Sequence, residues 1–359
     1  GTHTLKYKFT STTGGCADSI TQTIHVYAPP VAVFSVSSPL CETKTVTFST
    51  TSSSTEGSLT NWIWDFGDGS ALLNSPTGNT VTHTYTNWGD YDVKLKVITS
   101  NGCVSTDAVT RIHINPQPKP KFSIPASVCL PNANAVFTNL SSIADNTESS
   151  FTYLWNFGDP GSGVVNTSTG INPSHTYVTT GPYAVNLQVT SRAGCVHDTT
   201  ISLTTIHAQP LAVFNVDKDE VCLGDAIQFT DATNQIGGVA TAWTWDLNNG
   251  NTRTNASFSY TYPAAGTYQV SLYTVNSFGC RSTTFTDSVV IDAYPVISAG
   301  PDRLVLEGGQ ITLQPTATGV NLTYLWTPNQ YFSGSNTILN PIVLGVDDIT
   351  YTFTVTGKG

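Results

Sequence analysis

The residues with the most direct chemistry in this sequence are its seven cysteines, because two thiols at a suitable distance form a disulfide. They are spread along the chain, at Cys16, Cys41, Cys103, Cys129, Cys195, Cys222 and Cys280. The sequence has none of the Cys-x-x-Cys pairs that zinc sites and thioredoxin-like redox motifs use. Metal and redox roles are therefore disfavoured, and a disulfide framework formed in an oxidising compartment is favoured.

Four aspartates and two histidines are candidates for cation binding or acid–base chemistry. Asp65, Asp68, Asp159 and Asp246 supply the hard oxygen ligands that Ca²⁺ prefers. The alternative is a turn whose carboxylates accept hydrogen bonds from nearby backbone N–H groups, and we favour it because the spacing is not that of an EF-hand. His83 and His175 could act as bases, but no Ser or Cys nucleophile with an orienting carboxylate recurs near them. We expect no catalytic residue, no bound metal, no cofactor and no enzyme activity.

Four tryptophans are a further set of candidate functional residues. Trp64, Trp155, Trp245 and Trp326 recur at nearly constant spacing, each two positions after another aromatic residue. Such aromatic pairs could form a platform for sugar rings, which would depend mainly on Trp62 and Trp243. Residues i and i+2 share one face of a strand, however, so we favour burial of the recurring tryptophans in a core.

The segments around each tryptophan repeat as a unit. Downstream of it comes a stretch of alternating apolar and polar residues, as in residues 89–97, 181–189 and 266–272, which is typical of a half-buried strand. A Gly-Cys turn, another strand and a short proline-bearing linker follow. The pattern predicts an all-β chain of tandem immunoglobulin-like β-sandwiches, joined by proline-stiffened linkers into a semi-rigid rod.

The expected boundaries follow the linkers. Residues 1–27 correspond to the last two strands of a repeat, whose other strands we expect upstream or from another chain. Complete repeats are expected at 28–117, 118–209 and 210–294. Residues 295–359 are expected to form an Ig-like module that lacks its last strand.

The run Trp64-Asp65-Phe66-Gly67-Asp68-Gly69, with His83-Thr84-Tyr85 and Gly89-x-Tyr91-x-Val93 behind it, closely resembles the polycystic kidney disease (PKD) repeat. The resemblance covers residues 1–295, and the rest looks like the Ig-like module that often follows such repeats. The added cysteines and Gly-Cys turns are similar to repeats in large surface adhesins of Bacteroidetes, which type IX secretion exports and which include gliding-motility proteins. This resemblance implies an extracellular, cell-surface location.

The cysteine spacing predicts one disulfide inside each complete repeat. The pairs Cys41–Cys103, Cys129–Cys195 and Cys222–Cys280 have nearly equal separations in the sequence. By the loop-entropy model each bond would contribute about 4 kcal/mol. Cys16 is left unpaired in this segment, with a partner expected before Gly1. Because Leu306 stands where the repeats have their first cysteine, we expect no cysteine directly after Gly359.

The composition of the chain makes some classes of binding partner unexpected. The formal charge is -10 and Lys and Arg number only 14, without a cluster, so nucleic acid is not an expected partner. No stretch approaches the roughly 20 apolar residues of a membrane span, so we expect no direct membrane insertion. Ser19, Thr199 and Ser288 follow aspartates in a pattern on which Bacteroidetes attach O-glycans. Chance occurrence of these short motifs is an equally good interpretation.

We therefore expect a non-enzymatic structural or adhesive stalk segment of a large secreted or surface protein. Its partners would be other domains of the same chain, neighbouring subunits if it forms a filament, and surface glycans or matrix. One alternative is a carbohydrate- or matrix-binding accessory region of a secreted hydrolase. Another is polymerisation by strand complementation at residues 1–27.

Overall fold

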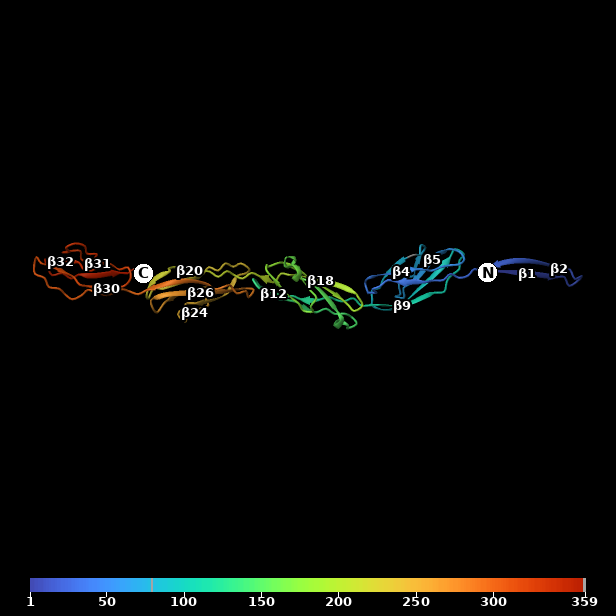
Figure 1. Cartoon of the computed structure of the whole chain (residues 1–359), viewed down its shortest axis with the longest axis horizontal. Helices are drawn as coiled ribbons and strands as arrows, with labels where there is room; N and C mark the ends of the chain where they lie inside the picture. The colour runs from blue at the N-terminus through green and yellow to red at the C-terminus, as the bar shows by residue number, and fades with distance from the viewer. Residues whose placement is uncertain (79, 358–359) are drawn as a thin grey trace. The chain divides into compact units, whose positions relative to one another are not determined.

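Strands dominate the computed structural model, which describes residues 1–78 and 80–357 (Figure 1). The helices of this described part are two short 3-10 segments, η1 (Glu148–Ser150) and η2 (Pro160–Asn166). We name the segments the N-terminal hairpin (1–27), the first repeat (28–117), the second repeat (118–209), the third repeat (210–294) and the C-terminal module (295–359).

The chain divides into two compact units. One consists of Gly1–Pro125, Ala135–His175 and Gly181–Thr204, and the other of Ala126–Asn134, Thr176–Thr180 and Thr205–Gly359. The all-β, tandem Ig-like fold expected from the alternating sequence pattern is confirmed.

The first repeat is a sandwich of two antiparallel sheets. One sheet has the order β3 (Phe34–Val36), β4 (Thr45–Thr50) and β7 (Thr80–Thr84). The other has the order β6 (Leu73–Ser75), β5 (Leu59–Asp65), β8 (Gly89–Thr99) and β9 (Ala108–Ile114). Along β8, buried and less buried residues alternate from Val93 onward, so one face of this strand lies in the core.

Trp64 is the centre of that core and is fully buried. Its ring lies 5.2 Å from the ring of Phe34 and 5.7 Å from that of Phe48, both in the opposite sheet. In β8, Leu95 lies directly across the ladder from Trp64. The tryptophan therefore packs between the two sheets and stabilises the sandwich by burying a large apolar surface.

The second repeat has a four-stranded sheet in the order β15 (Thr167–Ser168), β14 (Thr152–Asn156), β17 (Tyr183–Thr190) and β18 (Val196–Leu203). β10 (Phe122–Ser123) pairs with β13 (Thr138–Asn139). Trp155 in β14 is fully buried, with its ring 5.1 Å from that of Phe122. The remaining strands are β11 (Val128–Cys129), β12 (Ala133–Val136), β16 (Ser174–Tyr177) and β19 (Ile206–His207).

The third repeat has the same two-sheet arrangement. One sheet has the order β20 (Phe214–Val216), β22 (Ala226–Asp231) and β25 (Ser257–Thr261), and the other has the order β21 (Glu220–Cys222), β27 (Phe285–Asp292), β26 (Gly266–Asn276), β23 (Ala240–Asp246) and β24 (Thr252–Arg253). Trp245 is fully buried and packs against Phe214 and Phe229. The core of the first repeat is thus reproduced position by position.

The C-terminal module consists of three strand pairs. They are β28 (Val296–Ser298) with β30 (Thr316–Thr318), β29 (Gln310–Thr312) with β32 (Ile342–Leu344), and β31 (Thr323–Thr327) with β33 (Thr352–Thr356). Trp326 in β31 is buried, and its ring stacks 4.4 Å from that of Phe353 in β33.

The N-terminal hairpin consists of β1 (Thr2–Thr10) and β2 (Ala17–His25), paired antiparallel along their whole length. Every residue of both strands is exposed. Leu5, Tyr7 and Phe9 form one apolar row on β1. This row corresponds to the core-facing residues of β8 in the first repeat.

Candidate functional site

The first cysteine of each complete repeat, here called its start cysteine, lies beside the last strand of that repeat. Three parallel pairings show this, namely Cys41 with Asn115, Cys129 with His207, and Cys222 with Asp292. In each case the residue after the cysteine donates its backbone N–H to the carbonyl of the same partner, at 2.8 to 3.0 Å. The start cysteines therefore lie at the end where each repeat leads into the next segment.

The other cysteines, here called turn cysteines, close the turn between the last two strands. Each accepts a backbone hydrogen bond from the residue that opens the turn, in the pairs Ser11–Cys16, Thr99–Cys103, Ser191–Cys195 and Asn276–Cys280. The last three also donate their own N–H to the side-chain oxygen of that opening residue, at 2.9 to 3.2 Å. The turns of Cys103, Cys195 and Cys280 thus share one backbone arrangement, and the turn of Cys16 is one residue longer.

The disulfides join start cysteines to turn cysteines of the following repeat. Cys41 is bonded to Cys195, with their Cα atoms 5.7 Å apart, and Cys129 is bonded to Cys280, with their Cα atoms 5.5 Å apart. Cys16, Cys103 and Cys222 are free thiols. The expected pairing is therefore wrong: Cys41–Cys103, Cys129–Cys195 and Cys222–Cys280 do not form, and Cys103 and Cys222 are not bonded.

Strand length explains why pairing within a repeat fails. In the first repeat Gly89 pairs with Ile114, next to Asn115 and Cys41, whereas Cys103 follows Thr99 at the other end of β8. Roughly ten residues of extended strand span about 33 Å. A disulfide requires Cα atoms within about 7 Å. β26 separates Cys222 from Cys280 in the third repeat in the same way.

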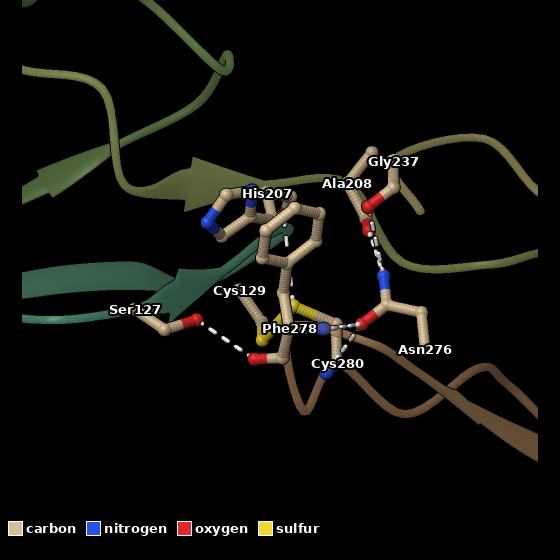
Figure 2. The surroundings of a disulfide bond; sticks show 8 residues. All are labelled: Ser127, Cys129, His207, Ala208, Gly237, Asn276, Phe278 and Cys280. Carbon is tan, nitrogen blue, oxygen red and sulfur yellow. Dashed lines mark hydrogen bonds between the residues drawn. A yellow bond between two sulfur atoms is a disulfide. The ribbon is translucent and has the colours of Figure 1, made fainter. Parts of the chain in front are cut away.

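The junction of the second and third repeats has a polar and aromatic framework around its disulfide (Figure 2). Asn276 donates its side-chain amide to the carbonyls of Ala208 and Gly237, at 3.2 and 3.1 Å. The ring of His207 stacks on that of Phe278, with centroids 3.7 Å apart. The bond to Ala208 and the ring stacking join the end of the second repeat to the turn of the third, whereas Gly237 lies in the third repeat itself.

A third contact crosses the same junction. The Ser127 hydroxyl donates to the carbonyl of Phe278 at 2.8 Å. The Cys280 side chain is fully buried. The disulfide thus lies within a packed interface and is supported by hydrogen bonds on both sides.

The junction of the first and second repeats is built from different side chains. Glu42 accepts a hydrogen bond from the backbone N–H of Gln117 in the linker, at 2.9 Å. Both Cys41 and Cys195 are buried. A cavity of about 350 Å³ adjoins them, lined by residues of both repeats that include Asn115, Ile143 and Arg192.

The aspartates in the Trp-Asp-x-Gly region bind their own turns. Asp65 accepts the N–H of Gly67 at 3.0 Å, and Asp246 accepts the N–H of Asn248 at 2.8 Å. Asp68 accepts the N–H of Ser70 at 3.1 Å. Within residues 1–78 and 80–357, no group of three or more His, Cys, Asp or Glu side chains is arranged to hold a metal ion.

Two of these aspartates also contact the histidines. His83 lies 2.7 Å from Asp68, and His175 lies 3.0 Å from Asp159. Burial raises the pKa of Asp68, but hydrogen bonds from Ser70 and His83 lower it by more, so this pKa lies below its usual value. The pairs connect the aspartate turn to the strand that carries the histidine.

The remaining candidate residues lie apart from the junctions. Trp62 is almost fully buried, and the Gly78 backbone lies so close to its ring that an added Cβ would overlap the ring atoms. Trp243 is partly buried and donates its indole N–H to Asp231 at 2.8 Å. Ser19 is exposed on β2, whereas Thr199 on β18 and Ser288 on β27 are partly buried.

The family model for the PKD domain matches three consecutive segments, residues 27–114, 115–206 and 207–291. Together they make up well over half of the chain. The chain belongs to the PKD domain family. The repeats are therefore called PKD repeats below.

Two curated relatives contain similar stretches. The pre-pro-metalloprotease PrtV of Vibrio cholerae is 29% identical over 151 residues, which are 40% of this chain and 16% of that protein. Collagenase ColA of Clostridium perfringens is 24% identical over 214 residues, which are 59% of this chain and 18% of that protein. This chain thus spans less than a fifth of the length of either relative.

Two solved structures are also similar to this chain. The crystal structure of the PKD1 domain of V. cholerae PrtV is 25% identical, with a TM-score of 0.21, covering 23% of this chain and 98% of that domain. A structure from a 1.5-MDa bacterial ice-binding adhesin is 12% identical, with a TM-score of 0.34, covering 75% of this chain and all of that structure.

The sequence reasoning missed the residues that form the junctions. Asn276, His207 and Phe278 showed no motif, because their partners come from a neighbouring repeat. The end of the sandwich at which each start cysteine lies had no sequence signal either, because it depends on the parallel pairing with the last strand of the repeat.

Proposed function

We propose that the chain is a non-enzymatic spacer in a secreted or cell-surface protein, in which consecutive PKD repeats are locked together to carry a binding domain away from its anchor. The observation that supports this most is the pair of disulfides between repeats. They cross-link the first repeat to the second and the second to the third. An enzyme or a ligand-binding module would not need this arrangement, whereas in a spacer under tension the cross-links keep consecutive repeats joined.

Three further features support a covalently secured joint. The linkers carry prolines, for example at Pro116, Pro118 and Pro210, and proline limits backbone freedom. At the second junction, hydrogen bonds from Asn276 and Ser127 accompany the disulfide. By the loop-entropy model, one disulfide that joins cysteines separated by 154 positions stabilises the folded state by about 5 kcal/mol.

The disulfides also support an oxidising location. Thiols are kept reduced in the cytosol of most organisms, and stable structural disulfides form in secreted and surface proteins. No helix among the described residues is long and apolar enough to cross a membrane. Because of the disulfides, we place the spacer outside the cell, as one part of a longer polypeptide.

Surface labelling of the source cells tests this function. Antibodies against the first PKD repeat should label intact cells or the secreted fraction. Mild reduction should then weaken attachment or surface extension of the protein without removing it. Labelling that requires cell lysis would contradict the proposal, and so would attachment that is unchanged after both disulfides have been reduced.

A second candidate function is an accessory region of a secreted hydrolase. It is favoured by the relatives, which are named as a metalloprotease and a collagenase. The test is binding of the purified chain to a glycan array and to matrix proteins, repeated with Trp243→Ala and Trp62→Ala. Binding lost in Trp243→Ala alone would support this function, because Trp62 is covered by Gly78. Absence of binding would contradict it.

A further inference from the structure

The two disulfides obey one rule, in which the start cysteine of a repeat bonds to the turn cysteine of the next segment. We call the resulting series of bonds the disulfide ladder. Applied to the free thiols, the rule assigns Cys222 to the turn of the C-terminal module. It assigns Cys103 to the start position of the repeat that contains the N-terminal hairpin.

We infer that Cys222 and Cys103 are cross-link sites that continue the disulfide ladder in both directions, each to a cysteine of the adjoining segment of the same polypeptide. This inference rests on the spacer function proposed above and extends it beyond the two bonds in the structure. Cys16, a turn cysteine, would bond one repeat further toward the N-terminus.

Cys222 has the same local backbone as the bonded start cysteines. It pairs with Asp292 as Cys129 pairs with His207. The next residue, Leu223, donates its N–H to the Asp292 carbonyl at 2.8 Å, and the equivalent bond from Leu130 to His207 measures 3.0 Å. The thiol is thus presented at the junction with the C-terminal module.

By the same rule, the C-terminal module would bring its own turn to this junction. In the three PKD repeats, the turn cysteine comes eight residues after the strand residue opposite the buried tryptophan, which is Leu95, Leu187 or Leu272. In the C-terminal module that opposite residue is Phe353. The same count therefore places a turn cysteine eight residues after Phe353.

A cavity marks the position of Gly357, the residue that would open this turn. Gly357 comes four residues after Phe353, as Asn276 comes four residues after Leu272. It lines a cavity of about 260 Å³ together with Asp292 and Tyr294. At the second junction, Asn276 contacts Ala208, the residue directly after His207. Gly357 thus lies beside the last strand of the third repeat, as the ladder requires.

Cys103 has equivalent surroundings on the other side. Its turn has the same hydrogen bonds as the turns of Cys195 and Cys280. The chain leaving the hairpin passes nearby, because the Ala28 N–H donates to Glu56 at 2.7 Å and the next residue, Gly57, lies against Asn101 of the turn. A start cysteine beside Tyr27 would correspond to Cys129 beside His207.

The oxidation is an ordinary thiol–disulfide exchange with a donor disulfide, such as that of a disulfide oxidoreductase. One thiolate attacks the donor and forms a mixed disulfide, and the second thiolate displaces the donor as a dithiol. The S–S bond forms as the donor's S–S bond breaks. Two electrons and two protons pass from the thiols to the donor.

The ladder also changes the expectation that no cysteine directly follows Gly359. Leu306 does occupy the start position, because Gly309 donates its N–H to Leu306 as Lys44 does to Cys41 and Asp225 does to Cys222. A missing start cysteine, however, has no effect on the bond that Cys222 makes. It removes only the bond to the following segment, so the ladder should end at the C-terminal module.

Differential alkylation of the protein isolated from its source tests this inference. The protein is denatured in N-ethylmaleimide without reductant, and the peptides that carry Cys103 and Cys222 are then identified by mass. Both cysteines should be unmodified, with Cys222 linked to the cysteine eight residues after Phe353 and Cys103 linked to a peptide before Gly1. In the isolated chain of residues 1–359 both should be fully alkylated, which serves as the control.

Three results would overturn the inference. They are alkylated Cys103 or Cys222 in the natural protein, a bond from either to another partner, and a gene without a cysteine near the predicted position after Phe353. A free Cys222 beside intact Cys41–Cys195 and Cys129–Cys280 bonds would leave the proposed spacer function standing. Failure of the surface labelling would instead contradict the spacer function alone.

Discussion

Mechanical stretching separates the two pairing schemes, because each lets a different length of chain unravel. With Cys41 bonded to Cys195 and Cys129 to Cys280, segments 41–129, 129–195 and 195–280 connect the same two cross-linked points in parallel. The shortest of these segments, 129–195, limits the extension between Cys41 and Cys280 after all repeats have unfolded. After reduction, the whole of segment 41–280 is available instead.

These segments give measurable lengths. A fully extended residue spans up to about 3.6 Å, so reduction should lengthen the stretched chain by roughly 620 Å. Cys195→Ser opens only the first bond and makes segment 41–129 the shortest route in place of 129–195. The oxidised length should then increase by roughly 80 Å. The assay is single-molecule pulling from the two termini, with and without reductant.

Cys103→Ser is the decisive variant. Cys103 is a free thiol in the structure, so its removal should leave the oxidised length unchanged. A Cys41–Cys103 bond would instead hide the chain between those two cysteines, and Cys103→Ser would release roughly 220 Å. A release of that size would refute the inter-repeat pairing.

Three further predictions concern the PKD repeats themselves. Trp64→Ala should lower the free energy of unfolding of the first repeat by about 3–5 kcal/mol, because the ring is fully buried. The control, Trp88→Ala, changes a side chain that is 43% exposed and should alter this free energy by less than about 0.5 kcal/mol. Urea unfolding measures both. Gly78→Ala should lower the free energy of unfolding by about 1–3 kcal/mol, because its Cβ would overlap the Trp62 ring. Gly69→Ala should lower it by less, because Gly69 has a similar left-handed φ but open space around it. Equal decreases in the two variants would contradict the packing of Gly78 against Trp62. The folded-state pKa of Asp68 lies below the usual value of 3.8, so its carboxylate stabilises the fold above that pH and loses this contribution as the pH falls through the folded pKa. Acid unfolding followed by fluorescence should therefore be less steep in Asp68→Asn, and an unchanged acid transition would contradict this assignment.

Much of the fold could be predicted because its determinants are local. The alternation in residues 89–97 and the spacing of Trp64, Trp155 and Trp245 depend on which residues face one core. Each strand therefore carries its own signal. The structure packs each of these tryptophans against two phenylalanines, which lie in the opposite sheet in the first and third PKD repeats.

The cysteine pairing could not be predicted in the same way, because it depends on direction. The nearly equal separations show that the two cysteines of one repeat lie in different strands, but not that they lie at opposite ends. The end is determined by the parallel pairing of Cys41 with Asn115 and of Cys222 with Asp292. Parallel pairs between distant segments leave no turn signature in the sequence.

The contacts around the junctions were hidden for a related reason. His207 and Phe278 stack across a boundary between two repeats, and Asn276 bonds carbonyls from both sides of that boundary. Within either repeat these residues look like ordinary strand-end and turn residues. Their importance becomes visible only when the neighbouring repeat is in place.

Tryptic mapping without reduction shows whether the PKD repeats are cross-linked to one another. Cleavage after Lys and Arg puts Cys41 in peptide 9–44 together with Cys16, Cys103 in 97–111, Cys129 in 122–192, Cys195 in 193–218, and Cys280 in 254–281. We predict that peptide 9–44 is linked to 193–218 and peptide 122–192 to 254–281. A bond from Cys41 itself to peptide 97–111, assigned by fragmentation of the linked peptides, or a link from 122–192 to 193–218, would show bonds within the repeats and contradict this pairing.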